Sequence, residues 1–152
     1  PGRAARPAPG PPAMSTADEA SGEGPVQRWG SGGPWEEIVG YSRVVRAGDH
    51  IHVAGTTATV DGVVVGVGDV AEQARVALSI IARALDGAGA SLADVVRTRM
   101  FVTDITHWEA VGRVHGEVFG TVKPVATMVE VSRLIDPDHL IEIEVDAFSP
   151  AR

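Results

Sequence analysis

The sequence contains no cysteine among its 152 residues. This absence excludes disulfides, thiolate metal ligands and a cysteine nucleophile, so the available chemistry rests on serine, threonine, carboxylates and histidine. Long apolar runs are also missing, because none approaches the roughly 18 residues that a membrane-spanning helix needs. The N-terminus lacks the basic and then apolar pattern of a signal peptide. We therefore expect a cytoplasmic protein with no membrane partner.

Basic and aromatic residues are scarce. The chain has 13 Lys and Arg against 20 Asp and Glu, a formal net charge of −7, and only 5% aromatic residues. An acidic domain repels phosphate backbones, and the sequence has no stripe of basic residues interleaved with aromatics. We therefore expect no nucleic-acid partner.

The first 34 residues differ in composition from the rest. They hold seven of the ten prolines and seven of the eighteen glycines, with almost no aliphatic side chains. Such a segment cannot bury enough apolar surface to offset its chain entropy, so we predict a disordered tail over 1–34. Trp29 and Trp35 stand out near its end, and we expect Trp35 to pack on the domain edge. Residues 36–150 are predicted to form one domain.

Two helices are predicted within this domain. Asp69 and Glu72 form a capping box that opens the first, which ends at Gly87 or Gly89. Its apolar stripe consists of Val70, Ala74, Ala77, Leu78, Ile81 and Leu85. A second capping box, at Thr106 and Glu109, opens the other helix. Its expected inner side carries Trp108, Val111, Val118 and Phe119.

Strands are predicted between and around the helices, and they define the fold class. They are a hairpin from Val44 through the run 51–60, a short strand at 63–65, a strand at 95–103 and two strands within 124–148. Three strands, a helix, a strand, a helix and two strands suit an α+β fold, with one mixed sheet and both helices on one face.

The last strand places carboxylates on one of its faces. Ile141, Ile143, Val145 and Ala147 alternate with Leu140, Glu142, Glu144, Asp146 and Phe148. The apolar side must cover a core, so the acidic side must meet water, a subunit interface or a pocket. With side chains such as Met100 and Met128 beside these carboxylates, the face is too mixed for plain surface. We therefore expect a closed oligomer with a pocket between subunits.

Five segments carry a resemblance to a known family. They are GYSRVV at 40–45, VAGTTA at 53–58, AEQARVALSIIARAL at 71–85, VVRTRMFVTD at 95–104 and VEVSRLIDPDHLIEIEVDA at 129–147. In order and spacing they resemble the Rid family, also called the YjgF family, of reactive-intermediate deaminases, over roughly residues 36–148. The resemblance implies a chorismate-mutase-like α+β fold, a homotrimer and a cleft for a small-molecule ligand between neighbouring subunits.

Several site residues follow from the resemblance. In active members of the family a tyrosine, a glutamate and backbone groups position water on an imine carbon, while an arginine clamps the substrate carboxylate. Tyr41, fourteen residues before Gly55, matches the cleft tyrosine and its glycine. Glu142 matches the water-orienting glutamate, which makes it the expected catalytic residue. Ala54 replaces a small polar residue of the cleft, and Gly112 replaces an asparagine.

The clamp arginine is missing from this sequence. Ala126 stands where the family has arginine, and Met128 replaces a cysteine whose backbone lines the cleft. Thr127, between them, suits either strand packing or a contact with water or a ligand hydroxyl. A guanidinium–carboxylate contact in a partly dry cleft contributes roughly 1.5–3 kcal/mol, which alanine cannot supply. We therefore expect a neutral or differently anchored ligand.

Other cations could replace the clamp. Arg43 follows Tyr41 by two residues on the same strand side and is the best substitute. Arg99 and Arg133 are expected to form solvated or interface salt bridges instead.

The histidines have two interpretations each. His115 could reach the cleft and move protons between an enamine and an imine, or it could be an exposed or hydrogen-bonded helix histidine. His50 and His52 could share a strand face, but no third ligand lies at a convincing spacing. We therefore expect neither a metal nor another cofactor.

Three functions remain open. The leading interpretation is a homotrimer that adds water to a small imine, enamine or related carbonyl metabolite, with Glu142 orienting the water and Tyr41 shaping the cleft. The second is a trimer that binds a small metabolite without turnover, which Ala126 favours. The third is a pathway enzyme that uses the same cleft for a different step, such as deamination of an aminated dienoate or an isomerisation.

Overall fold

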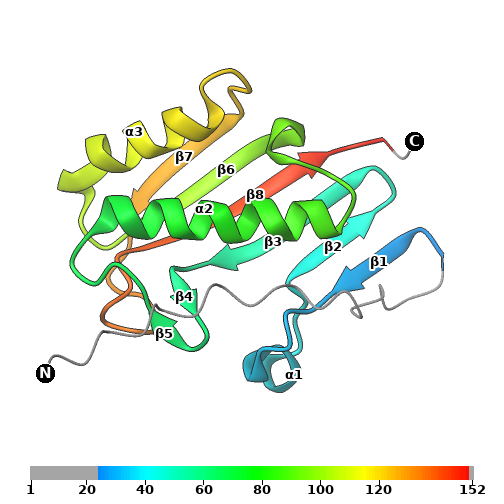
Figure 1. The fold of residues 1–152 in the computed structure, drawn as a ribbon, viewed down its shortest axis with the longest axis horizontal. Helices are drawn as coiled ribbons and strands as arrows, with labels where there is room; N and C mark the ends of the chain where they lie inside the picture. Colours follow the sequence, from blue (N-terminus) through cyan, green and yellow to red (C-terminus); the bar gives the residue numbers. More distant parts are fainter. Residues whose placement is uncertain (1–23, 151–152) are drawn as a thin grey trace, which may run out of the picture.

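The computed structural model describes residues 24–150, which form a mixed β-sheet with two long helices on one of its faces (Figure 1). The strands are β1 (Val26–Trp29), β2 (Val44–Ala47), β3 (His50–Thr56), β4 (Thr59–Val60), β5 (Val63–Val64), β6 (Val95–Val102), β7 (Val125–Glu130) and β8 (Ile141–Phe148). The helices are α1 (Pro34–Val39), α2 (Val70–Gly87) and α3 (Trp108–Phe119), with 3-10 turns at Leu92–Asp94 and Ile105–His107.

The six-stranded sheet has the order β1-β2-β3-β8-β6-β7, and β4 and β5 form a separate hairpin. The β6–β7 pair is parallel and all the other neighbours in the large sheet are antiparallel. Because α2 and α3 both cover the same face of the sheet (Figure 1), the predicted α+β fold is confirmed. Within residues 24–150 no helix combines the length and the apolar character needed to cross a bilayer.

Helix α2 forms where the sequence predicted it. The Asp69 side chain caps it by accepting a hydrogen bond of 3.1 Å from the Glu72 backbone N–H, which satisfies one of the free donors of the first turn. Five residues of the predicted stripe are buried against the sheet: Ala74, Ala77, Leu78, Ile81 and Leu85. The helix ends at Gly87, as expected.

Strand β8 lies in the middle of the sheet and shows the predicted alternation. Its residues Ile141, Ile143, Val145 and Ala147 are at most 2% exposed and belong to the core under α2. Glu142, Glu144 and Asp146 project from the opposite face, which neither α2 nor α3 covers, and they remain partly exposed. Burial of the apolar set therefore orients the carboxylates away from the core.

The predicted disordered tail is wrong for its C-terminal part. Strand β1 lies within it and pairs antiparallel with β2, Val26 opposite Ala47 and Trp29 opposite Val44. The ring of Trp29 packs against the core. A short edge strand needs only backbone partners and one buried side chain. The low aliphatic content of this segment therefore did not prevent β1 from forming. Residues 1–23 of that prediction lie outside the described residues.

Helix α1 was not predicted, although its start carries sequence signals. Pro34 occupies the first turn together with Glu36 and Glu37, which suits a helix N-terminus. Gly40 ends the helix with φ 82°, a conformation that glycine adopts without strain. Trp35 is 64% exposed, so the expectation that it packs on the domain edge is wrong.

Two further expectations differ from the structure. Asp104, rather than Thr106, caps the turn Ile105–His107, so α3 starts only at Trp108 and leaves its ring 58% exposed. The predicted strand 51–60 is divided by a β-bulge between Val53 and Thr56, after which the chain enters the β4–β5 hairpin. The bulge lies beside β8 and has consequences for the site described below.

Met100 and Met128 were expected beside the carboxylates, and this is also wrong. They lie opposite each other on β6 and β7, Met100 is 4% exposed, and both pack with the core on the helix-covered side of the sheet. The apolar residues that share the face of the β8 carboxylates are instead Phe101, opposite Glu142, and Val129, opposite Phe101.

Gln73 provides a direct test of how this fold is held together. Its side chain is fully buried, donates to the carbonyls of Gly66 (3.1 Å) and Asp138 (2.9 Å), and accepts from the Leu140 N–H (2.8 Å). It thus joins α2 to two loops. We expect Gln73→Met, which keeps the volume but leaves these groups unpaired, to lower the free energy of unfolding by about 1–3 kcal/mol in chemical denaturation.

Gln27→Met on the exposed edge strand β1 is the matched control, and it should change stability by less than about 0.5 kcal/mol. An equally small effect of Gln73→Met would show that the two loops hold their positions without this side chain.

Candidate functional site

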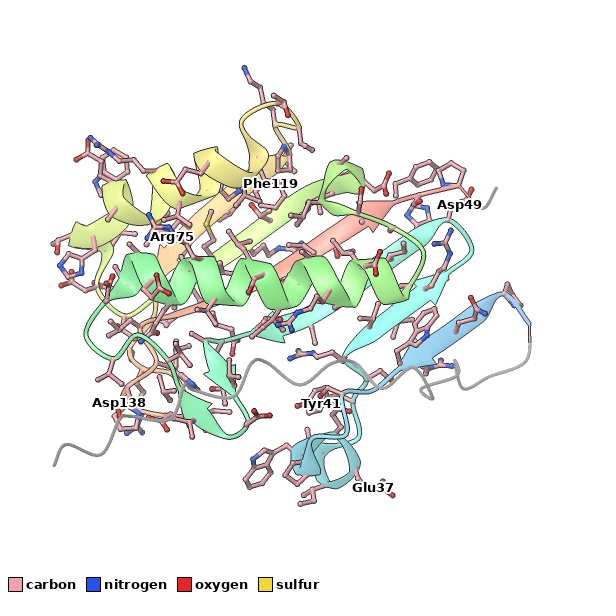
Figure 2. All side chains as sticks on the ribbon, viewed as in Figure 1. Glu37, Tyr41, Asp49, Arg75, Phe119 and Asp138 are labelled. Carbon is pink, nitrogen blue, oxygen red and sulfur yellow. The ribbon has the colours of Figure 1, made fainter. Side chains whose placement is uncertain are left out.

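Four residues meet at one end of the sheet, where β2, β3 and β8 lie side by side. Tyr41 belongs to the segment between α1 and β2 (Figure 2), and Arg43 follows just before β2. Gly55 lies in the bulged part of β3, and Glu142 is the second residue of β8. These are four of the residues that the sequence assigned to a site, and residues 24–150 bring them together within one chain.

Glu142 lies directly against the backbone of Gly55. A Cβ atom at position 55 would stand 2.7 Å from Glu142 Oε2 and 2.9 Å from Cδ, closer than two such atoms normally approach. Glycine therefore leaves the space that the carboxylate occupies. The bulge supplies this geometry, because the regular register between β3 and β8 is interrupted between Val53 and Thr56.

The three β8 carboxylates differ in their partners. Arg99 Nη1 lies 3.0 Å from Glu144 Oε1 and 3.5 Å from Asp146 Oδ2, and His52 Nδ1 lies 2.7 Å from Asp146 Oδ1. Glu142 forms no ion pair in the part of the chain that the structure describes. The carboxylate expected to be catalytic is therefore the one that the sheet leaves without a cation.

Arg43 is held beside this carboxylate by its own backbone and by Gly55. Its N–H donates to Trp29 O (2.8 Å), its carbonyl accepts from the Ala54 N–H (3.0 Å), and Nη2 donates to Gly55 O (2.7 Å). The guanidinium carbon lies 5.9 Å from the centroid of the Tyr41 ring. The buried Nε has no hydrogen-bond partner among the described residues.

Burial lowers the pKa of Arg43 from its ordinary value, and the nearby Tyr41, Glu36 and Glu142 partly oppose this shift. Glu36 itself is occupied elsewhere. Its carboxylate accepts hydrogen bonds from the Ser31 backbone N–H at 2.9 and 3.1 Å and from the Ser31 hydroxyl. Sequence reasoning missed Glu36, although a Pro34 followed by two acids is a signal for the helix that places it.

Ala126, Thr127 and Met128 do not join this cluster within one chain. They lie on the edge strand β7, and β8 and β6 separate that strand from β3. Ala126 and Thr127 are exposed, whereas Met128 is partly buried against the core. Thr127 lies opposite Arg99 on the face that carries the carboxylates, and Ala126 lies opposite Thr98 on the helix side.

His115 lies away from the cluster within one chain, so its reach toward a cleft between subunits stays a prediction. Its Nε2 lies 2.8 Å from the hydroxyl of Thr98, a fully buried residue, and its ring packs on Phe119 with centroids 4.7 Å apart. Burial lowers the pKa of His115. The alternative interpretation, a hydrogen-bonded helix histidine, describes this position.

The remaining candidates occupy the uncovered sheet face or a loop. Arg99 forms the ion pairs expected of it, and Arg133 is exposed in the loop after β7. The His50 ring meets Phe148 edge-on at 5.2 Å, and His52 pairs with Asp146. Across residues 24–150 no group of three or more His, Cys, Asp or Glu is placed to hold a metal ion.

Known proteins similar to this chain fall into one family. A family model described as Endoribonuclease L-PSP matches residues 35–149. The crystal structure of Rv2704 from Mycobacterium tuberculosis, a member of the YjgF/YER057c/UK114 family, has a TM-score of 0.74 and 51% sequence identity, covering 81% of this chain and 98% of that one.

Two curated relatives extend the comparison. The protein SCO2049 of Streptomyces coelicolor is 41% identical over 126 residues, which are 83% of this chain and 94% of that protein. The 3-aminoacrylate deaminase RutC of Acinetobacter baylyi is 41% identical over 80 residues, which are 53% of this chain and 63% of that enzyme.

The contact between Glu142 and Gly55 predicts an energetic coupling between these positions. We expect Gly55→Ala to destabilise the protein by about 1 kcal/mol, because the new Cβ must displace the carboxylate. In a Glu142→Ala background the same change should be neutral or slightly stabilising, since the clash is gone and alanine restricts the unfolded chain. Denaturation of the single and double variants gives the coupling free energy.

Gly112 in α3 is the matched control, because a Cβ there would meet nothing within 4 Å. Gly112→Ala should stabilise the protein equally with either residue at position 142. If Gly55→Ala cost the same in both backgrounds, Glu142 would not occupy the space beside Gly55.

Proposed function

This chain belongs to the Rid/YjgF family, and on that premise we propose that it hydrolyses a small imine or enamine with release of ammonia. The observation that carries the proposal is the carboxylate of Glu142, which lies against Gly55 without an ion pair in residues 24–150, next to Tyr41 and Arg43. A free carboxylate at a partly exposed position can hold a water molecule and accept its proton.

The reaction needs one water molecule and no redox partner. Glu142 takes a proton from the water while the oxygen bonds to the imine carbon, and the π electrons of the C=N bond move to nitrogen. Proton transfer to that nitrogen then allows the C–N bond to break, so that a carbonyl compound and ammonia leave. An enamine first needs a proton on carbon to become the imine. The Tyr41 hydroxyl and the Gly55 backbone are suited to orienting the substrate.

A relative supports the enamine class in particular. RutC of Acinetobacter baylyi is named a 3-aminoacrylate deaminase, and it matches about half of this chain. 3-Aminoacrylate carries an amino group on a C=C bond conjugated to a carboxylate. An enamine or imine of comparable size is therefore the substrate class that we propose.

We further propose that the working form is a homotrimer with each site shared between two subunits. Two observations support this assembly: β7 is an edge strand of the sheet that residues 24–150 form, and Ala126, Thr127 and Val129 are exposed on it. A copy that placed its β7 near the Tyr41 and Glu142 of its neighbour would close a cleft that the single chain leaves open.

Ala126 favours a second candidate function, a trimer that binds a small metabolite without converting it. With alanine at this position, β7 contributes no cation to orient a substrate carboxylate. A third candidate is a pathway enzyme that uses the same cleft and the same residues for a different step, such as deamination of an aminated dienoate or an isomerisation.

Ammonia release distinguishes the enzyme from the binding protein. We expect the purified chain to accelerate ammonia release from freshly generated imines, and Glu142→Gln to lower kcat by about 10²–10⁴-fold, because an amide cannot accept the proton. The measurement is a coupled ammonia assay with initial rates. Glu144→Gln, which removes a carboxylate already paired with Arg99, is the control and should retain most of the rate.

Melting curves complete this test. A ligand that raises the melting temperature of the protein, while ammonia release stays at the rate measured without protein, would support the binding protein instead. Equal rates for the wild type and Glu142→Gln would contradict the role given to this carboxylate.

Subunit mixing tests the shared site. Thr127→Arg on β7 should block a site formed with a neighbour, and Glu142→Gln should block its own half, so each variant alone should be inactive. In trimers assembled from equal amounts of both, about a quarter of the sites should combine two intact halves and recover activity. Sedimentation velocity verifies assembly. A monomeric wild type, or mixtures that never recover activity, would contradict the shared site.

A further inference from the structure

Arg43, just before β2, differs in its contacts from Arg46, the buried arginine within that strand. Arg46, 9% exposed, donates from Nε to Gly48 O (3.0 Å), from Nη1 to Ala88 O (2.8 Å) and from Nη2 to Ser149 O. All three of its nitrogens are satisfied by backbone carbonyls. Arg46 therefore holds β2, the end of α2 and the chain after β8 together, and it needs no further partner.

The guanidinium of Arg43 is only partly satisfied by the protein. Nη2 donates to Gly55 O, Nε is buried without an acceptor, and Nη1 donates to no acceptor among residues 24–150. No carboxylate of that segment lies within ion-pair distance of it. A buried cation in this state is costly, and such costs concentrate at sites where a ligand supplies the missing partner.

The two carboxylates nearest to Arg43, Glu36 and Glu142, do not act as its ion-pair partner because each is held elsewhere. Glu36 is held by three hydrogen bonds from Ser31, and Glu142 lies against Gly55. Both carboxylates are near enough to influence Arg43, yet neither pairs with it. Both carboxylates also repel an anionic ligand group. Such a group is therefore held here only if it contacts the Arg43 guanidinium directly.

We propose that Arg43 is the residue that anchors the acidic group of the ligand, from the β2 side of the site. This inference rests on the proposed function in one respect: the reacting carbon of the ligand must lie within reach of the water that Glu142 activates. A small planar molecule with a carboxylate next to its C=N or C=O carbon fits both contacts: its carboxylate accepts from Arg43, and its reactive carbon faces Glu142. The missing cation at Ala126 is thereby replaced from another strand.

Pyruvate and pyruvamide provide the test, because they share a planar carbonyl carbon and differ only in the acidic group. Titration calorimetry on the full chain should show at least about 10-fold tighter binding of pyruvate, the gain expected for a charge-assisted contact. Arg43→Gln should remove this preference without weakening pyruvamide. A purely structural role of Arg43 would weaken both ligands together.

Two further variants keep the test decisive. Arg113→Gln removes an exposed α3 cation that pairs with Glu109 (3.6 Å), and it should leave both affinities unchanged. Arg43→Lys keeps the charge but loses the planar fork, so it should lower pyruvate affinity about 3–10-fold and spare pyruvamide. This variant carries the test if Arg43→Gln does not fold.

The outcomes separate this inference from the proposed reaction. A wild type that binds both molecules equally, or fails to bind pyruvate, overturns the role of Arg43. A preference for pyruvate that persists in Arg43→Gln overturns it as well. Arg43-dependent binding of pyruvate together with no ammonia release from any imine overturns the proposed reaction and leaves the anchor supported.

Discussion

Strand β8 lies between β3 and β6 in the sheet. One of its faces meets the core under α2, and the other lies on the side of the sheet that neither α2 nor α3 covers. Ile141, Ile143 and Val145 are buried under α2, and their burial commits the alternate residues to the uncovered face. A shift of one residue in register would put three carboxylates into the core. The position of the catalytic candidate is thus a consequence of hydrophobic packing on the other side of the same strand.

Side chains from the neighbouring strands then distinguish these carboxylates. Arg99 on β6 and His52 on β3 pair with Glu144 and Asp146, so those two groups stabilise the uncovered face. Glu142 lies opposite the bulge of β3, where the local strand carries glycine rather than a cation. Arg43 comes close from β2 but is engaged with the Gly55 carbonyl. An unpaired anion and an incompletely bonded cation therefore stand near each other, which is an arrangement suited to a ligand with both an acidic group and an electrophilic carbon.

Much of this arrangement could be predicted from the sequence where the signal was local. The Asp69 cap and the apolar period of α2 depend on residues within one helix, and the alternation of β8 depends on residues within one strand. Strand β1 could not be predicted, because its stability comes from pairing with β2, which follows only after helix α1, and from the burial of Trp29. The same reason explains Trp108, which was assigned to the inner side of α3 because the start of this helix depends on the Asp104 turn. The sequence left two interpretations open for His115, and its hydrogen bond with Thr98 of β6 depends on the packing of α3 on the sheet.

Taken alone, the amino-acid sequence determined the α+β class and the family, because periodicity and the spacing of short segments are properties of the chain itself. It also predicted that Tyr41, Gly55 and Glu142 belong to one site. Only the tertiary structure decided which charges remain available. Arg43 and Arg46 are three residues apart and chemically identical in the sequence. Within residues 24–150, however, the Arg46 guanidinium donates to the carbonyls of Gly48, Ala88 and Ser149, while that of Arg43 donates only to Gly55 O. The difference is physical: a hydrogen-bond partner is defined by position in space, which the pairing of β2, β3 and β8 establishes.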